Sequence, residues 1–326
     1  MQVIIPLAGK GTRLRPHTHL VPKPMLKVAG RPVMDWVMDK LEGLQVSEII
    51  YITGHLKDQV EQYAREHYKW PARFIEQKVQ DGTAGAINLA RPHITEPVLI
   101  IFVDTVFEAD LTLVNRTTAD GIIWAKEVED YQRFGVVVTD AQGYMTKIVE
   151  KPSTPISKLA NIGLYYIEDT AALWAGIDHV LQSPANKGEF YLTDAFQHMI
   201  DHGKKILTAE VGGWYDCGKL DTLLETNEIL LRQGAARRRE FPGVTIHDPV
   251  RIADGVSIEH STIGPNVTLE AGTRVVNSRL EHTIVGEKGS VLDSTLRHSL
   301  LGDRVTVRAF KGTATLGDDA EVHGGA

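Results

Sequence analysis

The sequence predicts an α/β protein in which a mainly parallel sheet is followed by a short β-helix built from hexapeptide repeats. Two observations support this. Strand-like and helix-like segments alternate up to Leu231, and a six-residue apolar repeat begins near Val244. Alternation of strands and helices is typical of a parallel sheet with helices on both faces. Hexapeptide coils stack because no single coil can bury its apolar side alone.

The elements of the expected sheet follow the spacing of the apolar residues. Val98–Val103 is a continuous apolar run, as expected of a central strand covered on both faces. Apolar residues at a helical spacing predict helices elsewhere. In chain order the prediction is a strand at Val3–Leu7, a helix at Val33–Leu44, a strand at Ser47–Thr53, a helix at Leu56–His67, a strand at Arg73–Glu76, the start of a helix at Ala84–Ala90 and a strand at Val98–Val103.

The pattern changes after Leu231. The stretch Arg232–Glu240 is basic and is closed by Pro242 and Gly243. We therefore expect a domain at residues 1–231, a linker at 232–243 and a short β-helix domain at 244–326.

An internal repeat marks the expected β-helix. Segments Ile258–Gly264, Leu280–Gly286 and Leu296–Gly302 resemble one another and begin 22 and 16 residues apart, close to a coil of three hexapeptides. Within one coil, apolar residues recur every six positions, at 263, 269 and 275. Three histidines are expected at equivalent places, as stacked turn residues or, alternatively, as a metal-binding ladder: His260, His282 and His298.

Composition limits the partners. The net charge is -7, so an anionic ligand needs a local basic cluster and the chain as a whole repels nucleic acid. No apolar run approaches the roughly 20 residues that span a bilayer. The single cysteine, Cys217, fits a reducing compartment. We expect a cytoplasmic protein that binds neither membrane nor nucleic acid. A basic cluster, interleaved with glycine and proline as in a ligand-binding loop, consists of Lys10, Arg13, Arg15, Lys23 and Lys27.

The strongest motif is Leu7–Pro16, directly after the first strand. Glycines there let backbone N–H groups approach phosphate oxygens. Alone, the Gly-x-Gly pattern is weak. Together with Pro22–Leu26 and Gly30–Pro32, it resembles the sugar nucleotidylyltransferase family over roughly residues 1–230. That family includes glucose-1-phosphate thymidylyltransferases and uridylyltransferases and mannose-1-phosphate guanylyltransferases.

The resemblance implies a Rossmann-like nucleotidyltransferase domain and a left-handed parallel β-helix, which recurs in several branches of the family. It implies that a nucleoside triphosphate and a sugar-1-phosphate react to give a sugar nucleotide and pyrophosphate, with Mg²⁺ as cofactor. It also implies a homo-oligomer.

The resemblance assigns the triphosphate to Arg13, whose planar guanidinium matches phosphate oxygens. Lys23 would bridge the two substrates' phosphates. Gln77, with the following Asp81–Ala86 segment, resembles the part that reads the base; a plain turn with Thr83 as helix cap is the alternative. The implied nucleotide-binding set is Leu7, Ala8, Gly9, Gly11, Thr12, Gln77, Gly82 and Thr83.

Two carboxylates are implied magnesium ligands, since Mg²⁺ prefers oxygen ligands. Asp104 follows the apolar run, although Val103 stands where the family usually has glycine. Asp216 lies in a segment that resembles the family's Trp-x-Asp-x-Gly motif; a turn aspartate is the alternative.

The implied sugar-phosphate site comes from three further motifs. By analogy Glu150 and Asn161 bind sugar hydroxyls, Lys151 binds the sugar phosphate and Gly135 gives the ring room. Thr193 and Asp194 are expected first as a helix cap and second as support for the site.

Glucose-1-phosphate with dTTP or UTP is the expected substrate pair, and mannose-1-phosphate with GTP is the alternative. A non-catalytic regulatory subunit is a second hypothesis, and an enzyme whose β-helix adds acyltransferase activity is a third. The β-helix is expected to serve assembly or regulation.

Overall fold

The computed structural model of this chain describes residues 1–186 and 188–325. The last residue of the expected β-helix domain, Ala326, lies outside them. The chain forms two compact units. The sheet unit comprises Met1–Gly9 and Val37–Trp214, and the β-helix unit comprises Lys10–Trp36 and Tyr215–Ala326. No helix in the described part of the chain is long and apolar enough to cross a membrane.

The sheet unit contains a nine-stranded mixed sheet with the order β10-β9-β11-β6-β1-β4-β5, in which β8 pairs with β11 and β12. Its centre is parallel, as expected, because β6, β1, β4 and β5 run in one direction. Strand β11 is antiparallel to its neighbours. The nine strands are β1 Gln2–Pro6, β4 Glu48–Thr53, β5 Ala72–Glu76, β6 Val98–Ile101, β8 Gly121–Glu127, β9 Gly135–Thr139, β10 Met145–Glu150, β11 Leu159–Ile167 and β12 Ile206–Glu210. Strand β7, Thr105–Glu108, belongs to a separate two-stranded sheet.

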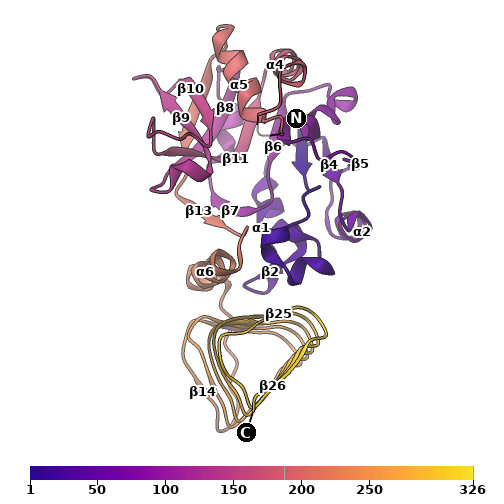
Figure 1. Cartoon of the computed structure of the whole chain (residues 1–326), viewed down its shortest axis with the longest axis vertical. Helices are drawn as coiled ribbons and strands as arrows, with labels where there is room; N and C mark the ends of the chain where they lie inside the picture. Colours follow the sequence, from indigo (N-terminus) through magenta and orange to yellow (C-terminus); the bar gives the residue numbers. More distant parts are fainter. Residues whose placement is uncertain (187, 326) are drawn as a thin grey trace. The chain divides into compact units, whose positions relative to one another are not determined.

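Helices α4 and α5 pack together in the sheet unit (Figure 1). Their apolar sides join one core that includes Trp174, Phe196 and strand residues such as Ile100. The predicted helix at 33–44 is shorter than expected: α1 ends at Met38 and a 3₁₀ turn follows over Asp39–Leu41. The helices are α1 Val33–Met38, α2 Lys57–His67, α3 Thr83–Asn88, α4 Thr170–Gln182, α5 Leu192–Asp201 and α6 Leu220–Leu230.

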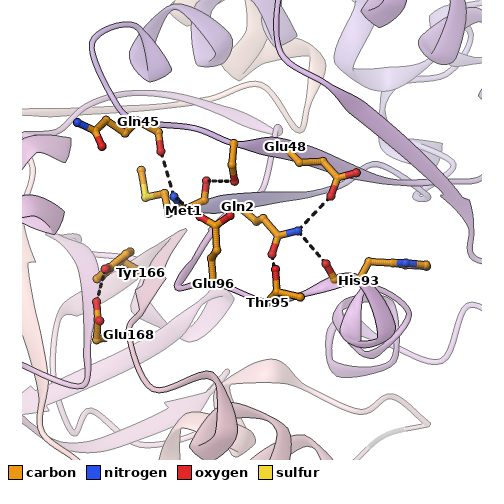
Figure 2. Close-up of polar contacts among 10 residues, drawn as sticks. Met1, Gln2, Gln45, Glu48, His93, Thr95, Glu96, Tyr166 and Glu168 are labelled. Atoms are coloured by element: carbon orange, nitrogen blue, oxygen red, sulfur yellow. Dashed lines mark hydrogen bonds and ion pairs between the residues drawn. The ribbon is translucent and has the colours of Figure 1, made fainter.

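The start of β1 is fixed by polar contacts (Figure 2). The Gln2 amide is buried; it donates to Glu48 Oε2 at 3.0 Å and to the His93 carbonyl at 2.7 Å, and it accepts from Thr95 N at 2.8 Å. The Met1 amino group pairs with Glu96 at 2.8 Å. These bonds satisfy a buried amide between β4 and β6. They hold in place the strand whose far end leads into Leu7–Gly9.

The β-helix unit contains parallel coils, whose stacked outlines are triangular in Figure 1. Strand β20 pairs in parallel with β22, and Arg279 lies opposite Thr295, 16 residues further on. Apolar residues at the six-residue step, Ile263, Leu269 and Val275, are fully buried in its core, as predicted. The coil strands are β14 Thr245–Ile246, β15 Val250–Ile252, β16 Ser257–Glu259, β17 Thr262–Ile263, β18 Val267–Leu269, β19 Arg274–Val276, β20 Arg279–Val285, β21 Ser290–Leu292, β22 Thr295–Leu301, β23 Thr306–Arg308, β24 Lys311–Gly312, β25 Thr315–Leu316 and β26 Glu321–His323.

The expected equivalence of the three histidines is wrong for one of them. His282 and His298 do occupy equivalent places, and their rings stack at 4.7 Å. However, Ile258 pairs with Val275 in a different sheet, so His260 corresponds to another corner of the coil. The two segments that begin 22 residues apart, at Ile258 and Leu280, therefore lie on different faces of the coils. A six-residue period repeats on every face of a coil, so it does not identify the face.

The same unit contains the N-terminal loop and the basic stretch. The loop forms 3₁₀ turns at Thr12–Leu14, His17–His19 and Lys23–Met25, followed by β2 (Lys27–Val28) and β3 (Arg31–Pro32). In the basic stretch, Arg237 pairs with Asp254 at 3.3 Å and Arg238 with Asp248 at 2.9 Å. Acidic residues of the first coils therefore bind the stretch that was expected to be a linker.

Candidate functional site

The backbone after β1 lies close to the loop after β4. Leu7 N donates to Ile52 O at 2.7 Å, and Ala8 O accepts from Gln80 Nε2 at 2.8 Å. A Cβ placed on Gly54 would lie 2.7 Å from Ala8 O, so only glycine permits this approach. Gln80 and Gly54 were not predicted. A glycine directly after a strand was the available signal for Gly54.

Gly9 differs from its neighbours because, apart from the two adjacent residues, no atom of the described part of the chain lies within 4 Å of a Cβ placed on it. Its lack of a side chain is therefore not required by packing. An exposed backbone without a Cβ at the end of a strand is what a phosphate oxygen needs in order to approach an N–H group.

The segment expected to read the base is held in a tight turn. Gln77 is 9% exposed, and its amide donates to Asp81 Oδ1 at 3.2 Å. Gly82 has φ 117°, and a Cβ there would lie 2.5 Å from Phe190 O. Two features therefore favour glycine at position 82, namely the positive φ angle and the close carbonyl of Phe190. Gln77 and Gly82 lie together, at the carboxyl end of β5.

Thr83 does not cap α3, in contrast to the alternative expectation. The residue before the helix is Gly82, and no side chain caps the first turn. The Thr83 hydroxyl instead accepts from Leu192 N at 2.9 Å, which links α3 to the start of α5. Thr193 and Asp194 also do not cap α5, whose N-cap is Tyr191 without a side-chain bond.

The residues expected to bind the sugar lie together around the start of β9. Asn161 Nδ2 donates to Gly135 O at 2.9 Å, and Thr193 Oγ1 donates to Glu150 Oε2 at 3.2 Å. A Cβ on Gly135 would lie 2.2 Å from Asn161 Nδ2 and 2.8 Å from Glu150 Oε2. Strands β9, β10 and β11 therefore place the Asn161 amide and the Glu150 carboxylate next to Gly135.

Tyr165 also contacts this cluster. The sequence motifs do not predict it. Its buried hydroxyl donates to Asn161 Oδ1. Burial raises the pKa of Tyr165 well above its ordinary value, and the nearby carboxylates of Glu150 and Asp104 raise it further. The phenol stays a donor at any physiological pH, so it fixes which way the Asn161 amide points. Asp104 thus lies near enough to act on the same group.

Glu150 and Lys151 form the charged part of the cluster. Burial raises the pKa of Glu150, while the Lys151 ammonium, 3.6 Å away, opposes this shift. Lys151 has φ 44°, an uncommon angle for a residue with a side chain. Its ammonium lies over the Tyr191 ring at 4.9 Å. The side chain remains 42% exposed, so it is accessible to an anion.

In the β-helix unit, the expected phosphate-binding loop folds around a buried threonine. Gly11 is left-handed, with φ 60° and ψ 34°, and its carbonyl accepts from Thr18 Oγ1 at 2.8 Å. A Cβ on Gly11 would lie 3.0 Å from Thr18 Cγ2 and 3.2 Å from Lys23 Cβ. The loop therefore returns on itself and places Lys23 beside the turn that begins at Thr12.

Arg13 and Asp216 also lie close together in this unit. Asp216 Oδ1 accepts from Gly218 N at 2.7 Å, and its carbonyl accepts from Thr226 Oγ1 at 3.0 Å. A Cβ on Gly218 would lie 2.8 Å from Asp216 Oδ1 and 3.6 Å from Arg13 Nη2. The position that a Cβ on Gly218 would occupy is therefore bordered by both the Asp216 carboxylate and the Arg13 guanidinium. Asp216 thus forms the turn that was the alternative expectation, and it also lies near Arg13.

Asp104 belongs to the sheet unit and Asp216 to the β-helix unit. Within residues 1–186 and 188–325, no group of three or more His, Cys, Asp or Glu side chains is arranged to hold a metal ion. A magnesium site that uses protein carboxylates together with substrate phosphates and waters does not need such a group.

Comparisons with known proteins agree with this architecture. Residues 2–233 match the family model described as Nucleotidyl transferase. The protein named Bifunctional protein GlmU from Methanococcus aeolicus is 34% identical over 263 residues, which are 79% of this chain and 62% of that protein. UTP–glucose-1-phosphate uridylyltransferase AglF of Haloferax volcanii is 33% identical over 66% of this chain and 89% of its own. Glucose-1-phosphate thymidylyltransferase of Streptomyces antibioticus is 28% identical over 90% of this chain and 80% of its own length.

A solved structure of UDP-glucose pyrophosphorylase with UDP-glucose superposes with a TM-score of 0.64 over 71% of this chain and 98% of that chain. At 23% identity this likeness concerns the fold. The chain spans 62% of the length of the Methanococcus aeolicus relative and 54% of a GlmU relative from Methanocaldococcus jannaschii.

Proposed function

Because the chain belongs to the nucleotidyl transferase family, we propose that it is a sugar-1-phosphate nucleotidylyltransferase. The reaction joins a nucleoside triphosphate to a sugar-1-phosphate and releases pyrophosphate. Glucose-1-phosphate with dTTP or UTP is the proposed pair. The names of the AglF and Streptomyces relatives, which specify glucose-1-phosphate with uridylyl and thymidylyl transfer, support this choice.

The observation that carries the proposal is the cluster of Gly135, Glu150 and Asn161 with Lys151 beside it. A partly buried carboxylate and a fixed amide supply the hydrogen-bond partners that sugar hydroxyls require. The glycine leaves space for a ring, and the exposed ammonium of Lys151 supplies a counter-charge for its phosphate. An apolar ligand would use none of these groups.

The chemistry is one displacement at phosphorus. An oxygen of the sugar phosphate attacks the α-phosphorus, a new P–O bond forms, and the bond from the α-phosphorus to the bridging oxygen of the leaving pyrophosphate breaks. The phosphate dianion needs no general base. Catalysis then consists of positioning and charge neutralisation. In this proposal Arg13 binds the triphosphate and Lys23 lies between the two phosphates that must approach each other.

Magnesium is the proposed cofactor, and Asp104 and Asp216 are its proposed ligands. Two carboxylates fit this ion, which typically takes one or two from the protein and keeps waters and phosphate oxygens as the remaining ligands. When bound, it would neutralise charge on the triphosphate. The nucleotide-binding role of Leu7, Ala8, Gly9, Gly11, Thr12, Gln77, Gly82 and Thr83 is part of the same proposal.

We also propose residues 1–231 as the catalytic domain, 232–243 as a linker and 244–326 as a β-helix domain that serves homo-oligomer assembly. Light scattering of the chain before and after removal of residues 244–326 tests the assembly role. A loss of oligomeric mass is expected, and an unchanged mass would reject it.

A substrate matrix tests the function itself. Four nucleoside triphosphates are combined with glucose-, mannose-, galactose- and N-acetylglucosamine-1-phosphate, and pyrophosphate release is measured by a coupled assay. The highest kcat/KM is expected for glucose-1-phosphate with dTTP or UTP. A best rate with mannose-1-phosphate and GTP would replace the proposed pair. No release from any combination would reject the enzyme and favour a regulatory subunit.

A further inference from the structure

A cavity of about 110 Å³ lies within the β-helix unit, directly behind the loop that carries Arg13 and Lys23. One wall comes from that loop and includes Met25 and Leu26. The opposite wall comes from successive coils of the β-helix and includes Ile284 and Leu300. An apolar cavity of about 150 Å³ is large enough for benzene in another protein, so this one accommodates a body of four to five carbons.

Two of the polar side chains that line the cavity each leave one buried atom without a hydrogen-bond partner among the described residues. Glu270 is 6% exposed and His17 is 4% exposed. The unpartnered atoms are Glu270 Oε1 and His17 Nε2. Buried polar atoms are nearly always paired, and such a pair of exceptions facing one cavity calls for an explanation.

The charges around the cavity favour a cation. Carboxylates on its coil side are Glu270, Asp303 and Asp318, while Lys27 is the one lysine or arginine among the lining residues. Lys27 is already engaged, since its ammonium pairs with Glu287 at 2.5 Å and lies 3.9 Å from Glu270 Oε2. Arg304 is bound to Asp319 at 2.6 Å, and its Nη2 atom lies 3.9 Å from Asp318 Oδ2, so the charge of Asp318 is partly compensated while Glu270 and Asp303 supply the remaining negative charge.

The pKa values of these groups are shifted mainly by burial. Burial raises the pKa of Glu270 despite the nearby Lys27 and Arg251, and it raises that of Asp303. Burial also lowers the pKa of His17 to about 4, so its ring is neutral at physiological pH and does not repel a cation.

We propose that this cavity binds a small organic cation, an ammonium or amidinium group on a short apolar body, and that the bound ligand regulates the loop that carries Arg13 and Lys23. The charged head bonds to Glu270 Oε1, and the apolar body contacts Met25, Leu26 and Leu300. Occupancy would stiffen the segment between His17 and Lys27, and thereby the position of Lys23. The regulatory part rests on the proposed function, whereas the binding part does not.

Binding is tested with the full-length chain and cyclopentylammonium chloride as probe, followed by ligand-observed NMR titration at pH 7.5. Cyclopentanol serves as the uncharged probe of similar shape. Glu270→Gln keeps the shape of the side chain and removes its charge, and Glu259→Gln on an exposed face of the coils is the matched control. Saturable binding of the ammonium is expected, weakened at least tenfold by Glu270→Gln and unchanged by Glu259→Gln.

No saturable binding, equal affinity for cyclopentanol, or equal binding to both variants would overturn the site. For the regulatory part, a saturating probe should change kcat/KM for the nucleotide at least twofold in the unmodified chain and not in Glu270→Gln. Binding without any kinetic effect would overturn that part. If no substrate pair gives activity, the proposed function fails while the NMR result still decides the site; an active enzyme that does not bind the probe rejects only the inference.

Discussion

Asn161 Nδ2 donates to the carbonyl oxygen of Gly135 at 2.9 Å, so that β11 and β9 meet with no room for a side chain between them. This contact fixes one of the groups proposed to bind the sugar, and Tyr165 orients it from the other side. The geometry makes the size of residue 135 a direct probe of the sugar site.

Gly135→Ala should therefore impair the sugar site. The added Cβ would lie 2.2 Å from Asn161 Nδ2 and 2.8 Å from Glu150 Oε2, so both groups must move. We expect KM for the sugar phosphate to rise at least tenfold, with a small effect on KM for the nucleotide. Gly212→Ala is the control, because its Cβ would have only an ordinary contact at 3.5 Å. Equal loss in both variants, or none in Gly135→Ala, would contradict the assignment.

Glu150 should give sugar binding its dependence on pH. Burial raises its pKa, so as the pH falls the acceptor carboxylate becomes protonated earlier than an exposed glutamate would. KM for the sugar phosphate should therefore rise more steeply, as the pH is lowered through this raised pKa, than protonation of the substrate's own phosphate at about pH 6 explains. Steady-state kinetics between pH 4.5 and 8 measure this. Glu150→Gln should have a high KM and keep only the substrate's part of the pH dependence; a variant that keeps the full wild-type profile would assign the titration to another group.

Gly82→Ala should destabilise the sheet unit strongly. Two causes act together, namely φ 117° and a Cβ only 2.5 Å from Phe190 O. We expect a loss of about 2–4 kcal/mol in the free energy of unfolding. Gly203→Ala separates the causes, since φ is 81° there but, beyond the adjacent residues, no described atom lies within 4 Å of its Cβ. That control should lose about 1 kcal/mol in urea unfolding. Similar losses in the two variants would mean that the carbonyl contact is unimportant.

Some elements of the fold can be predicted from the sequence alone, and some contacts cannot. Buried β6 and the coil positions 263, 269 and 275 follow from local apolar spacing, which is a property of the chain itself. The cluster around Gly135 was predicted by motif resemblance. The contact of Gln80 with Ala8 and the bond of Thr83 to Leu192 N were not, because each joins distant segments and needs no special residue pattern.

Two other features escaped prediction for reasons of topology. The segment Lys10–Trp36 joins the compact unit of Tyr215–Ala326, although its neighbours in sequence belong to the other unit. Nothing in a local window reveals such an exchange. The repeat in the sequence assigns His260 to the same corner as His282 and His298, which is wrong, because the hexapeptide period is the same on every face of a coil.

Arg13 should be essential for turnover and its neighbour Arg15 should not. Arg13 lies beside Asp216 and Gly218, where its planar group can bind a triphosphate in bidentate fashion. Arg13→Ala and Asp104→Ala are each expected to lower kcat at least a hundredfold, and Arg13→Lys to recover part of the loss. Arg15→Ala should stay within about threefold. Circular dichroism and urea unfolding confirm that the variants fold; near-normal turnover of Arg13→Ala and Asp104→Ala would reject this mechanism.

The most direct test of the central claim follows an oxygen atom. Glucose-1-phosphate labelled with ¹⁸O in its non-bridging phosphate oxygens is incubated with the enzyme, Mg²⁺ and dTTP or UTP, and the products are examined by ³¹P NMR. If the sugar phosphate attacks the α-phosphorus, the oxygen that joins the two phosphorus atoms of the sugar nucleotide carries ¹⁸O, and the pyrophosphate carries none. Label in the pyrophosphate, or an unlabelled bridge, would contradict the account.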